Sequence, residues 1–539
     1  MNQELSWENT IKELFSQGDI FLAATELVDF LSEKLNISRV YARQLIKRAV
    51  DKKLIKNSHP FKFKNNQYVY MAPNKHLNLD TLIQLSKEYK PSMYRALALL
   101  KKEGNILSFY EARKAAATPV ENIERYKLTK LDEEIKELIS NDFLYSVKDE
   151  ERDITYLAIK ELQDSPEITR LMRLHYEKMR LDSMFIPDIL RWLREHNFID
   201  SESPLYRRID NPSIGAKHND FLWDVCTYTN TTGFAINVGK KEKQTLVVLD
   251  VLVHREYLKV DLDGFYNRIQ SVRNSTQSGV RKILPFIFYV DIDEGVKKEI
   301  GRLNLLHFSL QSIFGRKVTE LIQRLDSLQK SLNKPIQHDD NNTNDIVENV
   351  EKSLKLMDET GHLDNLQNLK GDMFESLMYV VISNLFPHNS RIEHSKILKP
   401  YEYDVIVQRD DEIIIFELKG FKNTTIVNLG DNQTKNTVKW FFGKTLPHAK
   451  LKYTMPLTAF GYDKSKIRAC YITSANFSTE ATSWLEKTNE SKLKPKKLDC
   501  YYDRKKLLSL IKSDENLESM RATTGFVSLL EKYYLKELT

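Results

Sequence analysis

Residues 401–420 read YEYDVIVQRDDEIIIFELKG, two apolar runs separated by a short charged segment. Each run has the length of a strand and the charged segment predicts a tight turn, so the stretch should fold as a β-hairpin. Because side chains alternate along a strand, Glu417 and Lys419 should lie on one face of it. Asp404 begins the apolar part of the other strand, and pairing would bring its carboxylate close to Glu417. The hairpin therefore predicts two carboxylates and an ammonium at one edge of a sheet.

Helical and strand-like segments follow each other on both sides of this hairpin. A helix, GDMFESLMYVVISNLF, is predicted at residues 371–386, and it carries Glu375 among apolar residues that should face the sheet. Beyond the hairpin, NTVKWFFGKTLPHA at 436–449 predicts a second helix, and KIRACYITSA at 466–475 predicts a further strand. This order predicts an α/β domain with a helical tail over residues 351–539.

The hairpin residues have the chemistry that phosphodiester hydrolysis requires. Carboxylate oxygens are preferred ligands of Mg²⁺, and Asp404 and Glu417 could hold this ion, or Mn²⁺, together with the backbone carbonyl of Leu418. A bound ion would polarise a phosphoryl oxygen and lower the pKa of a water molecule. Lys419 could orient that water and neutralise developing charge, and Glu375 could supply a further carboxylate.

At these positions the sequence resembles the PD-(D/E)XK nuclease superfamily, which has the restriction-endonuclease-like fold. Asp404 matches the first acidic position of the family, Glu417 and Lys419 its E-x-K element, and Glu375 the glutamate that many members carry on a helix. The resemblance covers residues 366–480 and rests on a short motif. It implies a metal-dependent nuclease with the catalytic residues Glu375, Asp404, Glu417 and Lys419 and the metal ligands Asp404, Glu417, Leu418 and Glu375.

A simpler alternative is an ordinary surface hairpin in which Glu417 and Lys419 form a solvated ion pair. Asp404 at a suitable spacing, Glu375 on the helix and the apolar runs on both sides favour the catalytic interpretation. Tyr403 stands where many members of the superfamily have proline, which is a common substitution.

A basic segment follows the hairpin. From Lys435 to Arg468 there are eight basic residues and one acidic residue, Asp463, interleaved with aromatic residues. Lys439 and Lys444 could clamp phosphate groups of a nucleic acid. The aromatic residues are better explained as the packed face of a helix whose lysines are solvated.

The first 76 residues are predicted to form a winged helix-turn-helix. Three helical segments precede two strand-like runs, LIKNSHPFKFK and NNQYVYM. The helix at 39–52 separates a cationic face from an apolar face to which Val40 is assigned, as a helix in the major groove of DNA requires. The residues predicted to contact double-stranded DNA are Arg39, Arg43, Lys47, Arg48, Lys62 and Lys64. A solvated basic face without a ligand is the alternative.

Residues 77–165 predict a second, weaker version of this module, with helical segments followed by a possible wing at 141–159. Its last helix and its wing are rich in acidic residues, among them Glu133, Glu134 and Asp149. Because carboxylates repel phosphate, we interpret the module as a spacer or a protein-contact surface and consider a second DNA-binding module less favoured.

Residues 166–330 predict a further α/β domain whose layout echoes the C-terminal one. Glu177 lies in a helical segment, Asp224 in DFLWDVCTYT and Asp250 in QTLVVLDVLV. Leu252 stands where the catalytic lysine would be, and no side chain there is expected to replace the ammonium. The segment could be an inactive nuclease-like domain used for DNA binding or dimerisation, and an unrelated α/β domain explains the pattern equally well.

Composition and charge set wider bounds. A chain of 539 residues needs several hydrophobic cores, and the polar segment 331–350 is the best linker candidate. Its 81 basic and 75 acidic residues give a net charge of +6, which says little about partners. The three cysteines have no metal-ligand spacing, and no stretch approaches the roughly 20 apolar residues of a membrane span. These features predict a cytoplasmic protein without a membrane partner.

Together the patterns predict a multidomain α/β DNA endonuclease with N-terminal winged-helix modules, in which the first of these modules binds the duplex and the C-terminal domain cuts it. The resemblance implies a role in bacterial restriction, anti-phage defence or a mobile element, with a protein partner or homodimer that restrains cleavage. Two alternatives stay open: a non-catalytic DNA-binding regulator or complex subunit, and a nuclease of repair, recombination or RNA cleavage.

Overall fold

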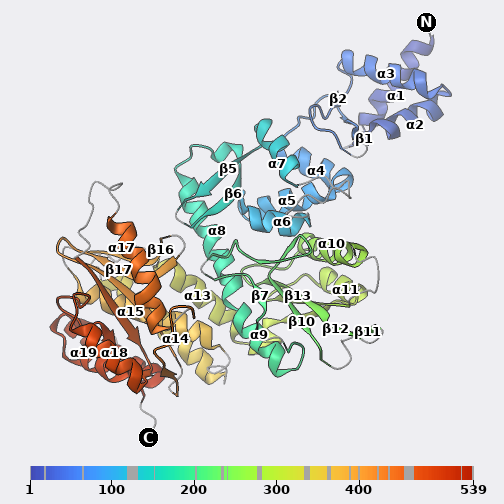
Figure 1. Cartoon of the computed structure of the whole chain (residues 1–539). Helices are drawn as coiled ribbons and strands as arrows, with labels where there is room; N and C mark the ends of the chain where they lie inside the picture. The colour runs from blue at the N-terminus through green and yellow to red at the C-terminus, as the bar shows by residue number, and fades with distance from the viewer. Residues whose placement is uncertain are drawn as a thin grey trace.

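The protein is a multidomain α/β chain in which two small N-terminal modules extend from a larger body (Figure 1). The computed structural model describes residues 2–536 except 17–19, 64–65, 118–130, 151, 201–202, 210, 232–235, 239–240, 276–281, 333–339, 361–365, 388–389, 399–400, 422–423, 435–436, 455–465 and 524. Among the described helices, none is both long and apolar enough to span a bilayer.

The first N-terminal module comprises residues 2–76 and contains three helices and a small sheet with the strand order β1-β3-β2. Its elements are α1 (Asn2–Ser16), β1 (Leu22–Ala23), α2 (Ala24–Leu35), α3 (Arg39–Asp51), β2 (Lys56–Asn57) and β3 (Val69–Met71). Helix α3 begins at Ser38, whose hydroxyl accepts a hydrogen bond from the Tyr41 amide (3.2 Å).

Two sequence expectations for this module are wrong. Val40 is 65% exposed, because it lies about 200° around the helix from buried Ala42. Residues 59–63 do not continue β2, because Phe61 and Phe63 turn into the core of the second module. They pack edge-on against Phe143 (5.3 Å) and Tyr89 (6.2 Å) respectively.

The second N-terminal module, residues 77–165, repeats the order of the first after an additional helix. Its elements are α4 (Leu79–Tyr89), α5 (Pro91–Lys102), β4 (Ile106–Ser108), α6 (Phe109–Ala116), α7 (Leu131–Ser140), β5 (Leu144–Asp149) and β6 (Ile154–Ile159). The sheet order β4-β6-β5 again puts the first strand beside the last. The strand pair predicted at 141–159 is confirmed as the antiparallel pair β5 and β6, whereas residues 121–130 of the predicted last helix lie outside the described residues.

The middle unit, residues 166–332, is built on the mixed sheet β7-β10-β13-β14-β15. Its elements are α8 (Glu167–Met184), α9 (Ile186–Glu195), β7 (Leu205–Tyr206), β8 (Ala216–His218), β9 (Phe221–Trp223), β10 (Val225–Thr229), β11 (Ile236–Val238), β12 (Lys241–Lys243), β13 (Thr245–Leu252), α10 (Lys259–Ser275), β14 (Ile283–Tyr289), α11 (Glu294–Arg302), β15 (Leu306–Ser309), α12 (Leu310–Phe314) and α13 (Val318–Leu332).

The C-terminal unit, residues 340–536, is built on the mixed sheet β16-β17-β18-β20-β22. Its elements are α14 (Asp340–Glu359), α15 (Gln367–Leu385), β16 (Arg391–Leu398), β17 (Tyr401–Gln408), β18 (Ile413–Lys419), β19 (Ile426–Val427), α16 (Val438–Trp440), the π-helical turn η3 (Phe441–Thr445), α17 (Leu446–Thr454), β20 (Ile467–Thr473), β21 (Asn476–Phe477), α18 (Thr479–Asn489), β22 (Tyr501–Tyr502), α19 (Arg504–Ser513), α20 (Glu518–Thr523) and α21 (Phe526–Leu530).

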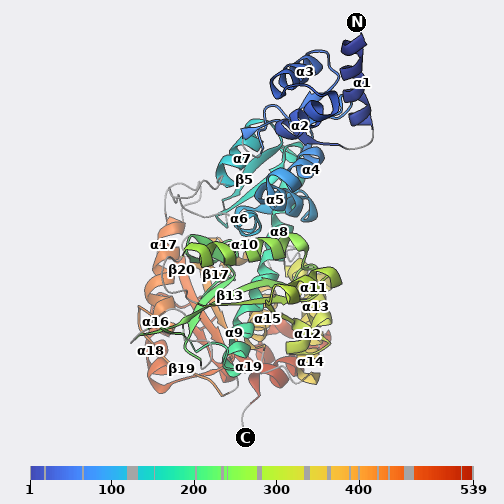
Figure 2. The ribbon, with the colours of Figure 1, turned by 90° about the vertical axis from the view of Figure 1, so that its right-hand side faces the viewer.

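The two large sheets have the same topology. In each, neighbouring strands among the first three are antiparallel, and the last two strands continue parallel to the third. One continuous apolar core joins the inner faces of both sheets through a shared helical layer that includes α9, α13, α14 and α15. Figure 1 shows α13 and α14 between the two sheets, and Figure 2, turned by 90°, shows the middle unit in front of the C-terminal unit. The units therefore form one layered body.

The predicted linker at 331–350 is wrong over its described second half. Helix α14 starts at Asp340, and Ile346, Val347 and Val350 are buried in the shared core. A polar stretch whose sparse apolar residues recur at three- and four-residue spacing forms a helix when a partner surface covers that stripe.

Buried charged side chains join the second module to the middle unit. Glu103, at the end of α5, contacts His254 Nε2 (3.0 Å) and Arg255 Nε (2.5 Å), and Asp182 contacts His254 Nδ1 (2.9 Å). Burial alone would lower the pKa of His254, but Asp182 and Glu103 raise it to about 9. Two further side chains lie next to these carboxylates: Arg207 is close to Asp182, and His175 is close to Glu103. The imidazolium therefore bridges two buried anions.

Raising the pH from about 6 to about 10 should loosen this junction. A group whose pKa is higher in the folded chain contributes stability that is complete below pH 6.5 and is lost as the pH rises through about 9. For His254 this corresponds to on the order of 3 kcal/mol. The melting temperature should fall across this window, and His254→Gln should flatten the fall. The same decline in both proteins would contradict this role of His254.

Candidate active site

Strands β17 and β18 form the predicted hairpin at the centre of the C-terminal sheet. They pair antiparallel with Val405 opposite Phe416. Asp404, one residue before this pair, accepts a hydrogen bond at Oδ2 from the Leu418 amide (2.6 Å). The backbone thus holds the first carboxylate against the end of the neighbouring strand, and the predicted hairpin is confirmed.

Lys419 lies at the centre of an acid cluster. Its Nζ is 3.1 Å from Asp404 Oδ2, 3.1 Å from Glu417 Oε1 and 3.7 Å from Glu375 Oε1. It also donates a hydrogen bond to the Leu418 carbonyl (2.9 Å). These charged side chains are only 13–24% exposed, so the alternative of a solvated surface pair does not describe them.

The Lys419 ammonium marks a point on which oxygen atoms suited to a hard cation converge. They are the carboxylates of Asp404 and Glu417 and the carbonyl of Leu418. Within the described ranges, no group of three or more His, Cys, Asp or Glu side chains is arranged as a metal-ion site. The donor set fits a divalent cation that keeps some of its waters, provided that the ammonium moves aside.

Carboxyl groups outnumber cations around this point. The interacting acids are Asp372, Glu375, Glu402, Asp404 and Glu417, and the interacting cations are Arg180 and Lys419. Burial, aided by Asp404 and opposed by Lys419, raises the pKa of Glu417 to about 7. Burial also raises the pKa of Glu402 to about 7 and that of Asp372 to about 6. Such a cluster is short of positive charge, which a divalent cation would supply.

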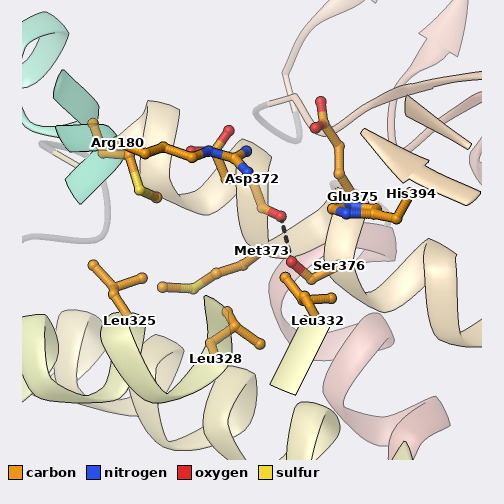
Figure 3. A pocket seen from close by; sticks show the side chains of 10 residues that line it. Arg180, Leu325, Leu328, Leu332, Asp372, Met373, Glu375, Ser376 and His394 are labelled. Carbon is orange, nitrogen blue, oxygen red and sulfur yellow. Dashed lines mark hydrogen bonds between the residues drawn. The ribbon is translucent and has the colours of Figure 1, made fainter. Parts of the chain in front are cut away.

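Sequence reasoning missed Arg180, which reaches the acid cluster from the middle unit. Arg180, on α8, lines a small cavity of about 20 Å³ together with Asp372, Glu375 and His394, and Figure 3 shows its side chain extending towards Asp372. Among the described residues, Arg180 Nε and Asp372 Oδ2 are buried without a hydrogen-bond partner. Burial and then Arg180 lower the pKa of His394 to about 3. The cavity therefore places an unsatisfied guanidinium nitrogen beside the acids.

The middle unit carries a pair of acidic residues at the equivalent positions of its own sheet. Val225 pairs with Leu249, so Asp224 precedes and Asp250 follows this pair, as Asp404 and Glu417 do in the hairpin. The Val251 amide donates to Asp224 Oδ2 (2.8 Å), just as the Leu418 amide donates to Asp404. Leu252 holds the position of Lys419 and is packed in the outer core.

The expectation that no side chain replaces the missing ammonium is wrong. Lys114, on α6 of the second module, forms ion pairs with both carboxylates, with Asp224 and at 2.8 Å with Asp250. Glu177, by contrast, stays apart from this pair and contacts Arg173 (3.7 Å). This contact joins α6 and β13, which are far apart in the sequence, so no local sequence pattern predicts it.

The basic residues predicted beside the hairpin lie on the helical segment that covers the outer face of the C-terminal sheet. Lys444 is exposed and Lys439 is partly buried. Phe441 and Phe442 are buried in the outer core, which confirms the packing interpretation for these aromatic residues.

On α3, the predicted DNA-contacting residues Arg39, Arg43, Lys47 and Arg48 are all exposed. Arg39 pairs with Asp29 (2.7 Å), and Arg39 and Arg43 line a surface pocket of about 280 Å³ that also includes Gln67 and Tyr70. Lys62 is exposed, and Lys64 lies outside the described residues.

Comparison with known proteins adds no relative to these observations. No protein-family model matches the sequence, and no curated protein and no solved structure is significantly similar to the chain.

Proposed function

We propose that this protein is a metal-dependent endonuclease that hydrolyses phosphodiester bonds at the Asp404, Glu417 and Lys419 cluster. The observation that carries the proposal is the convergence of two partly buried carboxylates and a backbone carbonyl on one ammonium, at 3.1, 3.1 and 2.9 Å. Ordinary surface hairpins do not bury such a charge cluster without compensation. The elements around it follow one another in the order that the sequence predicts: a helix, the hairpin, a helical segment and a further strand.

Asp404, Glu417 and the Leu418 carbonyl would hold Mg²⁺ or Mn²⁺, with Glu375 nearby to complete the charge. The bound ion would polarise the phosphoryl oxygen and lower the pKa of a water molecule. The Leu418 amide keeps the Asp404 carboxylate in place throughout.

Lys419 has two tasks in this scheme. When Asp404 and Glu417 hold the metal ion, they no longer pair with Lys419. The Lys419 ammonium can then orient the attacking water and stabilise negative charge on the phosphoryl oxygens. The water oxygen bonds to phosphorus, one phosphorus–oxygen bond of the diester breaks, and a proton ends on the leaving oxygen. The products are a phosphomonoester and a hydroxyl.

DNA is the proposed substrate because of the first N-terminal module. Its order of helices and strands is that of a winged helix-turn-helix, and α3 exposes a cationic face at the position of a recognition helix. The corresponding helix of the second module, α7, carries Asp132 and Glu133 in its first turn, and their carboxylates would repel phosphate. Only the first module is therefore proposed to bind the duplex.

Replacing Arg43 and Lys47 by alanine together should weaken duplex binding roughly 10- to 100-fold. The slope of log affinity against log salt concentration should fall by the amount expected for the loss of about two phosphate contacts. Fluorescence anisotropy with a labelled duplex at several salt concentrations measures both effects. Lys136→Ala, an exposed lysine on α7, is the matched control. An equal loss in the control would show a nonspecific charge effect.

Arg180→Ala should slow cleavage roughly 10- to 100-fold while Mn²⁺ binding persists, because Arg180 adds positive charge beside the acid cluster and its Nε has no hydrogen-bond partner among the described residues. Added guanidinium should restore part of the rate. Arg170→Ala, an exposed arginine on the same helix, should have no effect. A drop in melting temperature without guanidinium rescue would assign Arg180 a structural role only.

The proposal is tested by incubating the full chain with supercoiled plasmid, linear duplex, single strands and RNA, in Mg²⁺, Mn²⁺ or EDTA. We expect metal-dependent cutting of duplex DNA. Cutting confined to RNA would assign the site to RNA cleavage. Binding without cutting under any metal condition would favour the non-catalytic regulator or complex subunit.

The proposal also includes a role in bacterial defence or mobile elements. It further includes a protein partner or homodimer that restrains cutting.

A further inference from the structure

The acid pair of the middle unit is filled by a side chain from another module. Lys114 reaches from α6 to Asp224 and Asp250, and its own side chain is 13% exposed while those of its two partners are at most 2% exposed. In the C-terminal unit, the equivalent ammonium is carried by the same strand as the acid. Here it comes from α6 of the second module.

The carboxylates of Asp224 and Asp250 also have other hydrogen-bond and ion-pair partners. Asp224 accepts a hydrogen bond from Tyr110 (2.8 Å), and Asp250 accepts one from Tyr257 (2.8 Å). Two further cations, Arg207 and Arg268, lie 3.6 Å from Asp224 and 3.3 Å from Asp250. Against the opposing effect of burial, Lys114 and Arg268 lower the pKa of Asp250 to about 2. Unlike the C-terminal cluster, this one has no shortage of positive charge.

The backbones of the second module and the middle unit also meet without a gap. A Cβ on Gly264 of α10 would lie 2.6 Å from the Ala115 carbonyl of α6, and one on Gly215 would overlap the ring of Tyr110. The Glu103, His254 and Arg255 junction lies on the same interface. This close packing leaves no room for the second module to slide over the middle unit.

The first module is fixed to the second in a different way. Phe61 and Phe63 are buried in the second module's core, and the Tyr89 hydroxyl donates to Glu26 Oε2 (2.7 Å) on α2. The described contacts therefore run without interruption from α3 to the middle unit, and from there through the shared core to β18.

We propose that the middle unit is a closed counterpart of the catalytic unit, in which Lys114 shuts the acid pair to metal ions and locks the N-terminal modules at a fixed separation from Lys419. The protein would then cut at a constant distance from the DNA sequence that α3 binds. This last step rests on the proposed function, whereas the lock does not.

The lock is tested by hydrogen–deuterium exchange of the full chain. Lys114→Met keeps the length of the side chain and leaves two buried carboxylates short of a partner. Amide exchange in α6, β10 and β13 should rise at least about tenfold, with α15 and β18 unchanged. Lys102→Met, an exposed lysine of the same module, should alter nothing. Unchanged exchange in α6 and β13 of Lys114→Met would overturn the lock.

A second variant guards against simple misfolding. Lys114→Met combined with Asp250→Asn removes one charge of each sign, so it should fold and should recover at least half of the lost protection in β13. If the double variant is no better protected than Lys114→Met, Lys114 is not held by this acid pair.

Closure to metal ions has its own readout. Glu417→Gln weakens the open site, so at Mn²⁺ concentrations that saturate the wild type this variant should show no measurable Mn²⁺ binding in a calorimetric titration. Residual Mn²⁺ binding that disappears when Asp250→Asn is added would show that the middle unit is open, and would overturn the proposal.

The position of cutting tests the consequence. With wild type, mapped cuts should fall within a few nucleotides of one offset from the bound sequence, and with Lys114→Met they should spread at least about fivefold. Scattered cuts by a wild type whose exchange data show the lock would refute the fixed separation. Absence of any cutting, with the lock present, would count against the nuclease proposal alone.

Discussion

Lys419→Ala is expected to slow DNA cleavage about 10³-fold while duplex affinity stays within a factor of two. The loss combines the water-orienting role with the charge that the ammonium places beside the phosphoryl oxygens. Duplex affinity should persist because the α3 residues lie in another module. Single-turnover cleavage of a labelled duplex gives the rate, and anisotropy gives the affinity.

Mn²⁺ binding should stay equal or become tighter in this variant, because the ammonium competes for the oxygen atoms of Asp404 and Glu417. Lys487→Ala, an exposed lysine on α18, is the matched control and should behave as wild type. If Lys419→Ala instead lost Mn²⁺ binding together with folding, Lys419 would be a structural residue of the cluster.

Glu417→Gln is expected to weaken Mn²⁺ binding at least about 100-fold and to abolish measurable cleavage, since a neutral amide replaces a charged ligand. Its melting temperature should stay equal or rise, because the substitution removes one acid from a cluster in which burial and Asp404 already raise the pKa of Glu417 to about 7.

Isothermal titration with Mn²⁺ and a thermal melt check both parts of this prediction. Glu480→Gln, an exposed glutamate on α18, provides the comparison. A variant that unfolds at lower temperature and still cuts would show that Glu417 stabilises the sheet and holds no ion.

The hairpin could be predicted from sequence because its information is local. The apolar runs, the charged turn and the strand alternation place Asp404 beside Glu417, and the register with Val405 opposite Phe416 follows from the length of the turn. The helix that carries Glu375 has the same kind of signal. The sequence therefore predicted that Asp404, Glu417 and Lys419 lie together, and the structure confirms this proximity; their catalytic role stays a prediction.

The residues that sequence reasoning missed are all brought in from a distance. Arg180 comes from α8 of the middle unit, and Lys114 comes from α6 of the second module. Their roles depend on how whole modules pack, which no local pattern encodes. Leu252, at the position of Lys419, indicates a missing ammonium in the sequence, because the lysine that supplies it, Lys114, belongs to another module.

Errors in the fold have the same origin. Phe61 and Phe63 alternate as in a strand, but the second module offers them a core, so they leave the sheet. The polar start of α14 predicted a linker, yet Ile346 and Val350 find a buried stripe between the two units. Tertiary burial overrode local preference in both cases.

The central claim is that the Lys419 cluster hydrolyses phosphodiester bonds with a divalent cation. Its most direct test is the loss of supercoiled plasmid over time, with purified full-length wild type and Lys419→Ala side by side in Mg²⁺ and in EDTA. The account predicts nicked or linear product only for wild type with Mg²⁺. Equal conversion by wild type and Lys419→Ala, or conversion in EDTA, would contradict it.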